Sequence, residues 1–555
     1  MMEVQSSHSA PGPGGGHSLH SSAMGQSVGA SSNVTPRVST MGTKTYGGTE
    51  PPMSAREKLQ RAQKLFTDKH SSEMYDRQVS AIDSICDNNY AGFLLQDLDS
   101  VHPIVTLCNE RITQAGQPMF VEPLCRLLGL CMQPFMVTGV VEDERCSGAL
   151  ALLLKAISRC IYCPVLRVQM TAAETLMPFV HVIDPDKELR ENSNPVGARR
   201  ARLQHHVLAE SGIVPLLANV LKSLQQGAPG SNLHLESAMC RIMRELSASP
   251  QGCTMLAECG AIGVLASMLV NDFRDESVSC AVQVLWNVLE LCDPIVWEPV
   301  VTGELVLYLN DLFGRLLCDG YRDSDKDLRN DVILVATLCT RVPACLPAFA
   351  ASPTSDTSSL RGYSFLSLAL AGTLWPLLGK SHPLLARGRV LQSKTAESNA
   401  GEWHELELLK WTFNLCARTT MDVDCLGTML ACGFMDAAIR FLEPGFGGHF
   451  TQFSEDGGTM GGSGVLGKST RRPGQGQVPT SRVPAALTGW EPENVRELQM
   501  AVVSSLTEVA PRCPEEFALQ GGNQALLTFL LYIAEAPQVR VFSSPALAHI
   551  PAAPR

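Results

Sequence analysis

Residues 256–271 read LAECGAIGVLASMLVN, and residues 208–223, which start 48 positions earlier, read LAESGIVPLLANVLKS. In both, an apolar helical run follows a glycine, which favours a sharp turn at positive φ between two helices. Related stretches recur at 302–317, 430–442 and 519–531. A spacing of about 40–47 residues is typical of armadillo and HEAT repeats. The chain is therefore predicted to be all-α, as an armadillo/HEAT-like α-solenoid.

The segments between these stretches carry apolar stripes with the period of a helix. In 278–292, apolar residues recur at intervals of four, three, four and three positions. A stripe with this period covers one face of an amphipathic helix. Because one repeat cannot bury both of its apolar faces, neighbouring repeats must stack into a superhelix. We therefore expect armadillo-like helices over 55–443 and 495–535, with Ser54 capping the first helix.

Four segments flank or interrupt this pattern. Residues 1–54 are rich in Ser, Gly, Pro and Thr, and residues 444–494 are dense in Gly, Pro and Ser. Such compositions do not offset the entropy cost of ordering, so we predict a disordered N-terminus and a Gly-rich disordered insertion. Residues 536–555 are interpreted as a disordered tail, and about 353–400 as a further insertion on one edge of the solenoid.

The net charge of the 555-residue chain is −11. Residues 1–54 are neutral and 444–490 carry about +2, so the helical body carries about −13. A body this acidic repels a phosphate backbone, which disfavours nucleic acid as a partner. The 19 cysteines are scattered through apolar helical stretches, as expected of reduced, buried thiols in a cytoplasmic protein. No apolar run reaches the roughly 18 residues that cross a bilayer, so no membrane insertion is expected.

One stretch matches a nucleotide-binding motif. Residues 462–469 read GSGVLGKS, which fits the pattern GxxxxGK[ST] of phosphate-binding loops. That motif needs a preceding strand and a following helix, so that backbone N–H groups surround the phosphates. Gly-, Ser- and Pro-rich sequence flanks the match instead. We interpret it as a chance match, and we expect no cofactor.

Two other patterns are compared with metal sites. The CxxC pair at 160–163 stands alone, and zinc needs four ligands, so both cysteines are interpreted as core residues. Asp323, Asp325 and Asp327 alternate as in a calcium loop, but leucines replace the loop's glycine and its final glutamate. We expect a solvated turn there, with Asp327 capping a helix that begins at Leu328. No metal site and no catalytic constellation is predicted.

Two tryptophan–asparagine pairs fall on helices that would line the inner groove of an armadillo array. Trp286 directly precedes Asn287, and Trp411 precedes Asn414 by three positions. Importin-like receptors use Trp and Asn in the pattern W-x-x-x-N to hold an extended basic peptide in this groove. Neither pair has that spacing. Each tryptophan is therefore interpreted either as a core residue or as a contact in the groove.

Several stretches, in the same order along the chain, resemble one family. They are CRLLGLCMQPF (125–135), VQVLWNVLEL (282–291), LYLNDLFGRLLCDGYRDSDKDLRNDVILVATL (307–338) and LQMAVVSSLTEVAP (498–511). They are similar to the armadillo-like axonemal proteins of the cilia- and flagella-associated protein 69 family. The most distinctive part is Leu328-Arg329-Asn330-Asp331, and the resemblance covers roughly 75–535.

The resemblance implies a structural component of the axoneme of motile cilia and flagella, associated with the central-pair apparatus and without a catalytic site. We therefore expect a non-enzymatic cytoskeletal scaffold whose partners are other axonemal proteins. Its association with microtubules would be indirect, because the acidic surface of tubulin repels an acidic body. Arg329, Asn330 and Asp331 join the two Trp–Asn pairs as candidate protein-binding residues. The alternative is a soluble armadillo-repeat adaptor or transport receptor for linear peptides.

The end of the array is a further candidate for partner binding. The last apolar helix ends near Ala534, and no polar capping helix follows it in the sequence. Terminal repeats need a polar outer face, because an uncovered apolar face is exposed to water. A partner is therefore expected around 519–534.

Overall fold

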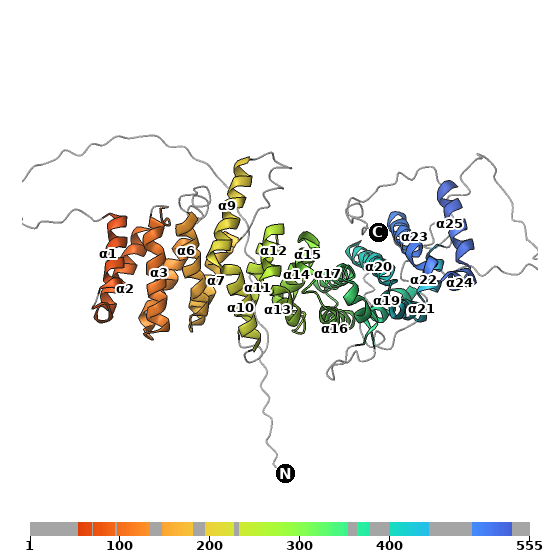
Figure 1. Cartoon of the computed structure of the whole chain (residues 1–555), viewed down its shortest axis with the longest axis horizontal. Helices are drawn as coiled ribbons and strands as arrows, with labels where there is room; N and C mark the ends of the chain where they lie inside the picture. The colour runs from red at the N-terminus through yellow and green to blue at the C-terminus, as the bar shows by residue number, and fades with distance from the viewer. Residues whose placement is uncertain are drawn as a thin grey trace, which may run out of the picture. The chain divides into compact units, whose positions relative to one another are not determined.

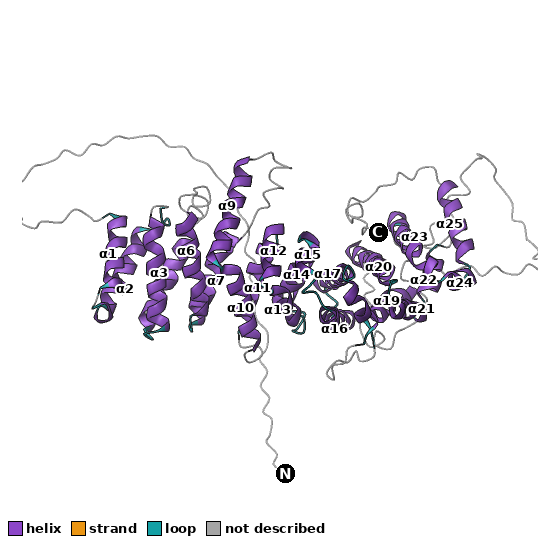
Figure 2. Cartoon of the chain, viewed as in Figure 1, coloured by secondary structure: helices purple, strands orange, loops and turns teal. Residues whose placement is uncertain are grey.

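The computed structural model describes most of the chain from Ser54 to Glu535, and every regular element in this described part is a helix (Figure 2). The described residues are 54–68, 70–94, 97–132, 147–180, 195–226, 232–352, 363–377, 399–442 and 491–535. The segments expected to be disordered, 1–54, 444–494 and 536–555, lie outside the described residues except at their edges. An all-α repeat fold is confirmed.

Each repeat contains up to three helices, as the one formed by α12 (Pro250–Glu258), α13 (Ala261–Met268) and α14 (Glu276–Leu291) shows. Helix α12 starts with a proline, whose missing N–H needs no acceptor in a first turn. The Ser249 side chain accepts a hydrogen bond of 3.1 Å from the N–H of Gly252 and so caps this helix.

The second and third helices of successive repeats form two rows. In each row every helix contacts the next one along the chain, and Figure 1 shows this succession from α1 to α25. The second helices are α1 (Ala55–Thr67), α3 (Leu98–Thr113), α6 (Ser147–Arg159), α10 (Ile213–Gln226), α13, α16 (Gly303–Asp319), α19 (Phe365–Leu377), α22 (Phe434–Phe441) and α25 (Gly522–Glu535). The third helices are α2 (Tyr75–Asn88), α4 (Val121–Cys131), α7 (Leu166–Val180), α11 (Leu233–Leu246), α14, α17 (Asp323–Cys339), α20 (Asn399–Thr419) and α23 (Pro492–Val509).

The remaining elements, most of them short, connect these rows. The α-helices are α9 (Pro195–Ser211), α12, α15 (Pro294–Trp297), α18 (Leu346–Ala350), α21 (Val423–Ala431) and α24 (Pro514–Leu519). The 3₁₀ turns are η1 (Ser71–Glu73), η3 (Pro118–Phe120), η5 (Cys160–Tyr162), η6 (Pro343–Cys345) and η9 (Ala510–Arg512).

Four of the repeated glycines make the turn that their sequence predicts. They have left-handed backbone angles and are Gly212 (φ 65°), Gly260 (φ 77°), Gly433 (φ 82°) and Gly521 (φ 78°). Each precedes a second helix, so the turn is a fixed part of the repeat. Gly303 of the related stretch 302–317 differs, because it is the first residue of α16 and Thr302 makes the turn in an extended conformation.

The insertion expected at about 353–400 contains a core helix, α19. Phe365 of α19 stacks on Phe313 at 5.0 Å between ring centroids and meets Phe349 edge-on at 5.7 Å. The described side chains of this helix are buried except for the half-buried Ser367, because α16, α18, α20 and α21 pack against it. A helix that is apolar all round has no amphipathic stripe, which explains why the periodicity did not reveal it.

The two predicted helix caps have different outcomes. The Ser54 cap is confirmed: its hydroxyl accepts from the N–H of Glu57, and the Glu57 carboxylate accepts from the N–H of Ser54 at 2.8 Å. The prediction that Asp327 caps a helix beginning at Leu328 is wrong, because α17 begins at Asp323. Asp325 fixes that start, since its carboxylate accepts from the Arg322 N–H at 3.1 Å.

Candidate protein-binding surface

The third helices leave one stripe of side chains incompletely buried, and we call the stripes of α14, α17, α20 and α23 the third-helix surface. Its residues recur at intervals of three and four positions on each helix. They are Gln283, Trp286 and Glu290 on α14, Asp327, Asp331, Leu334 and Leu338 on α17, Glu407, Lys410, Asn414 and Arg418 on α20, and Glu497, Met500 and Ser504 on α23. Because these helices contact one another in sequence, their stripes adjoin.

Ion pairs connect neighbouring stripes. Lys410 lies 2.8 Å from a Glu407 oxygen on its own helix and 2.7 Å from a Glu497 oxygen on α23. Burial alone would lower the pKa of Lys410, but hydrogen bonds to the two carboxylates raise it. Near the start of the array, Arg126 of α4 likewise pairs with Asp83 of α2 at 2.8 Å. The Lys410–Glu497 and Arg126–Asp83 pairs each connect two adjoining third helices.

Trp286 and Asn287 lie together on α14 but point to different neighbours. The half-buried Trp286 packs against the core, and its indole N–H donates to the carboxylate of Glu290. Asn287 donates a hydrogen bond of 2.9 Å to the hydroxyl of Ser247, at the end of α11. Asn287 therefore joins two repeats, whereas Trp286 contributes to the third-helix surface.

Arg329 and Asn330 attach α20 to α17. The side chain of Arg329 is only 3% exposed, and its guanidinium lies 3.1 Å from a Glu405 carboxylate oxygen. Asn330 donates a hydrogen bond of 2.9 Å to the backbone carbonyl of His404. The His404 ring lies 2.9 Å from the carboxylate of Asp327, which adds a third connection between these helices. These contacts span 74 to 77 positions of sequence.

Asp331 lies one turn further along α17 and has a different environment. Burial, together with repulsion from the nearby Asp327 carboxylate, raises the pKa of Asp331 to about 7. The side chain is therefore close to its titration midpoint near neutral pH. A cationic group of a partner at this position would favour the charged form.

Trp411 and Asn414 lie on α20. Arg418 of the same helix and Arg341, just past the end of α17, are two arginines that no sequence motif indicated. The half-buried Trp411 packs against the core, and Asn414 accepts from Arg418 Nε at 3.0 Å. Burial and the guanidinium of Arg341 lower the pKa of Arg418. Arg341 in turn donates to the carbonyl of Leu289 at 3.2 Å.

Arg341, two residues past the end of α17, is thus near enough to Arg418 of α20 for their like charges to interact. Two guanidinium groups at this spot can receive a carboxylate or phosphate group of a partner. Sequence patterns miss such a pair, because its members are far apart in the chain and only the stacking of repeats brings them together.

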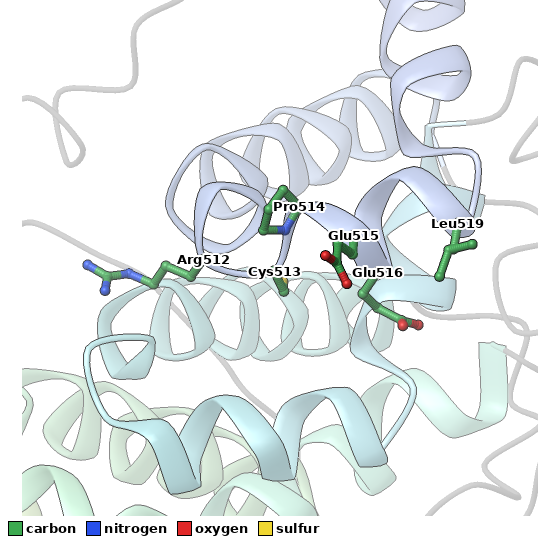
Figure 3. A pocket seen from close by; sticks show the side chains of 6 residues that line it. All are labelled: Arg512, Cys513, Pro514, Glu515, Glu516 and Leu519. Carbon is green, nitrogen blue, oxygen red and sulfur yellow. The ribbon is translucent and has the colours of Figure 1, made fainter.

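A pocket of about 380 Å³ lies beside η9 and α24 (Figure 3). Its lining residues are Arg512, Cys513, Pro514, Glu515, Glu516 and Leu519. Burial and the nearby Glu516 raise the pKa of the Cys513 thiol. A thiol with a raised pKa stays protonated near neutral pH and is not an activated nucleophile. The pocket therefore suits polar contact better than covalent chemistry.

The remaining sequence motifs are the cysteine pair, the aspartate run and the match at 462–469. Cys160 and Cys163 are buried at η5, and burial raises the pKa of both thiols. Among the described residues, no three His, Cys, Asp or Glu side chains are placed to hold a metal ion. The match at 462–469 lies outside the described residues. Of the helices described, none is by itself long and apolar enough to cross a membrane, although two bent helix pairs meet those criteria jointly.

A family model described as "Cilia- and flagella-associated protein 69, ARM repeat" matches residues 57–349, which is more than half of the chain. The chain belongs to this family. It is therefore an armadillo-repeat protein associated with cilia and flagella, which confirms the resemblance noted in its sequence. The matched range includes Trp286, Asn287 and 329–331, whereas Trp411 and Asn414 lie beyond it.

Curated relatives named cilia- and flagella-associated protein 69 support this membership. Those of Papio anubis and Homo sapiens are 22% identical over 484 residues, and that of Mus musculus is 23% identical over 490 residues. These alignments cover 85% of this chain and 43% of each relative. The chain spans less than half the length of these relatives.

Proposed function

We propose that the chain is a structural scaffold of motile cilia and flagella, acting through protein–protein contacts in the axonemal central-pair apparatus. The family match over 57–349 carries this proposal, because it joins an armadillo array to an association with cilia. Armadillo arrays expose long surfaces whose backbone is held by neighbouring repeats, which suits simultaneous contact with several proteins. We propose no enzymatic activity.

The third-helix surface supports protein binding by its chemistry. It combines apolar side chains, such as Trp286, Leu338 and Met500, with charged groups of both signs. Apolar anchors surrounded by polar groups are typical of protein interfaces. Because the helical body carries about −13, we propose that contact with microtubules is indirect and made through basic partner proteins.

Retention in axonemes tests the proposal. A tagged copy of this chain should remain with demembranated axonemes and be absent from axonemes that lack the central pair. Trp286→Ala combined with Leu338→Ala should reduce retention several-fold, because these changes remove apolar anchors. Leu152→Ala, at a leucine that is 48% exposed on α6, is the matched control and should change nothing. A purely cytosolic distribution of the unmodified chain contradicts the proposal.

A second candidate is a soluble adaptor that binds linear peptides. The positions of Trp286 on α14 and Trp411 on α20 favour it, because both are third helices. This function predicts peptide binding that Trp286→Ala and Trp411→Ala together abolish, without any retention in axonemes. Measuring both properties on the same variants separates the two candidates.

A further inference from the structure

One part of the acidic body is locally basic. Residues 147–226, which contain α6, α7, α9 and α10, hold nine Lys and Arg but only six Asp and Glu. Their net charge is therefore +3, whereas the helical body as a whole carries about −13. A basic region inside an acidic protein attracts anions that the remaining surface repels.

The cations of α6 and α10 have no carboxylate on their own helices, because neither helix contains an acidic residue. Lys155 and Arg159 lie four positions apart on α6, and both are exposed, as is Lys222 on α10. Among the described residues, none forms an ion pair with these three side chains. Like charges one helical turn apart repel each other, so a bound anion would relieve the repulsion between Lys155 and Arg159.

Other second helices carry carboxylates instead. Asp99 begins the exposed side of α3, Glu304 lies in the first turn of α16, and Asp436 lies in that of α22. The absence of acidic residues from α6 and α10 is therefore not a general property of second helices.

Helix α9 (yellow in Figure 1) adds a further cation, because it is longer than its counterparts in later repeats. Helices α12 and α21 begin ten residues before their left-handed glycines, whereas α9 begins 17 residues before Gly212. Arg202 is exposed on α9, which contacts both α6 and α10. The one acidic residue of α9, Glu210, lies 3.1 Å from His206.

We propose that the exposed cations of these three contacting helices, Lys155, Arg159, Arg202 and Lys222, bind an acidic segment of a partner protein. We call these four residues the basic surface. Carboxylates of the segment would form charge-assisted hydrogen bonds with the arginines and lysines. Since packed helix axes lie about 10 Å apart, roughly 10 extended residues are long enough to reach all three helices.

Three other occupants fit less well. Nucleic acid usually stacks on aromatic side chains, and the sequences of α6, α9 and α10 contain no Phe, Tyr or Trp. A microtubule wall is an extended acidic surface and would meet the acidic remainder of the body as well. Residues 181–194 of this chain carry a net charge of only −2, because Lys187 and Arg190 lie among their four carboxylates.

Two labelled peptides of about 12 residues test the inference in solution, with the intact chain. One alternates glutamate with glycine and serine, and the other has glutamine in place of every glutamate. Fluorescence anisotropy should show at least tenfold tighter binding of the glutamate peptide, and raising the salt concentration should weaken that binding.

Charge reversal locates the site. Lys155→Glu with Arg159→Glu should weaken binding of the glutamate peptide roughly tenfold or more, and the milder Lys155→Gln with Arg159→Gln should weaken it several-fold. Arg77→Glu with Arg274→Glu is the matched control, because it makes the same change in net charge at exposed arginines on and near other helices. The control should keep the affinity of the unmodified chain within about twofold.

Four results would overturn the proposal. The first is equal affinity for both peptides, or binding that the α6 substitutions leave unchanged. The second is tighter binding of a single-stranded oligonucleotide than of the glutamate peptide. The third is sedimentation with bare microtubules that the α6 reversals abolish, which would make tubulin the occupant.

The fourth is peptide binding that appears only after the four carboxylates of 181–194 are changed to amides, which would assign the basic surface to that segment. The inference rests on the proposed scaffold function, for which it names the chemistry of one partner. Because peptide binding is measured in solution, its failure would leave retention in axonemes, the test of that function, unaffected.

Discussion

Arg329 of α17 is nearly buried, and its guanidinium depends on acceptors in the next repeat. A buried cation needs a partner, and Glu405 of α20 supplies one from 76 positions away. From the sequence alone, Arg329 and Asn330 are candidates for binding other proteins. The structure places both at the contact between α17 and α20, where their side chains bind Glu405 and the backbone of His404 in the same chain.

Arg329→Ala should therefore destabilise the packing of α17 against α20. Loss of charge-assisted hydrogen bonds predicts a free energy of unfolding lower by about 2 kcal/mol. Chemical denaturation followed by circular dichroism measures the change, and hydrogen exchange should locate it in α17 and α20. Arg440→Ala is the control, because Arg440 is exposed and pairs with Asp436 on its own helix. Such a pair contributes only about 0.5 kcal/mol, so equal losses in the two variants would contradict the assignment.

Asp331 predicts a dependence of stability on pH. Its pKa of about 7 in the fold lies above the ordinary value of 3.8, so the folded chain holds the proton more tightly. The cost of burying this carboxyl is absent below the ordinary pKa, grows as pH rises, and is complete above about pH 7. Asp331→Asn should thus stabilise the chain by about 2 kcal/mol at about pH 8, allowing for partial exposure, and by almost nothing near pH 4. Denaturation midpoints measure this, and a gain independent of pH would refute it.

At the scale of helices and turns, local features were predictable from sequence. The Ser54 cap and the glycine turns depend on residues within a few positions of one another. Features fixed by packing were not predictable. Asp325 moves the start of α17 upstream of the expected cap, and α19 lacks a stripe because neighbours cover all its sides. Likewise, only the stacking of repeats brings Arg341 near Arg418.

Two glycines of one repeat should respond oppositely to alanine. Gly260 has φ 77°, and a methyl group added there would meet no atom within 4 Å. Gly260→Ala should therefore cost about 1 kcal/mol through backbone strain alone. Gly263 lies within α13, with the same free space, so Gly263→Ala should stabilise by about 0.5–1 kcal/mol. Thermal denaturation of both variants tests this, and a change of the same sign would argue against the turn geometry.

At the scale of the whole molecule, contacts join each repeat to its neighbours along the chain. Stability in such an array is roughly a sum of terms for single repeats and for adjoining pairs. Damage to one repeat should therefore spread only to the repeats beside it. This property suits a scaffold, because a distant binding surface keeps its structure.

Leu285→Ala tests this locality. Leu285 is 0% exposed on α14, so its truncation should cost about 3 kcal/mol through lost burial and the remaining cavity. Hydrogen exchange should increase in α11, α14 and α17 while α2 and α4 keep their protection. Leu291→Ala, at a leucine that is 42% exposed, should have little effect. Uniform loss of protection along the chain would show that the array unfolds as one unit.

We propose that this array holds neighbouring axonemal proteins through its third-helix surface. Carbodiimide cross-linking of intact axonemes, with identification of the linked peptides, tests it most directly, because the reagent joins carboxylates to lysines in direct contact. We predict links from Asp327, Glu290 or Glu497 to lysines of basic central-apparatus proteins. Links confined to this chain, or made only to proteins outside the axoneme, would contradict the claim.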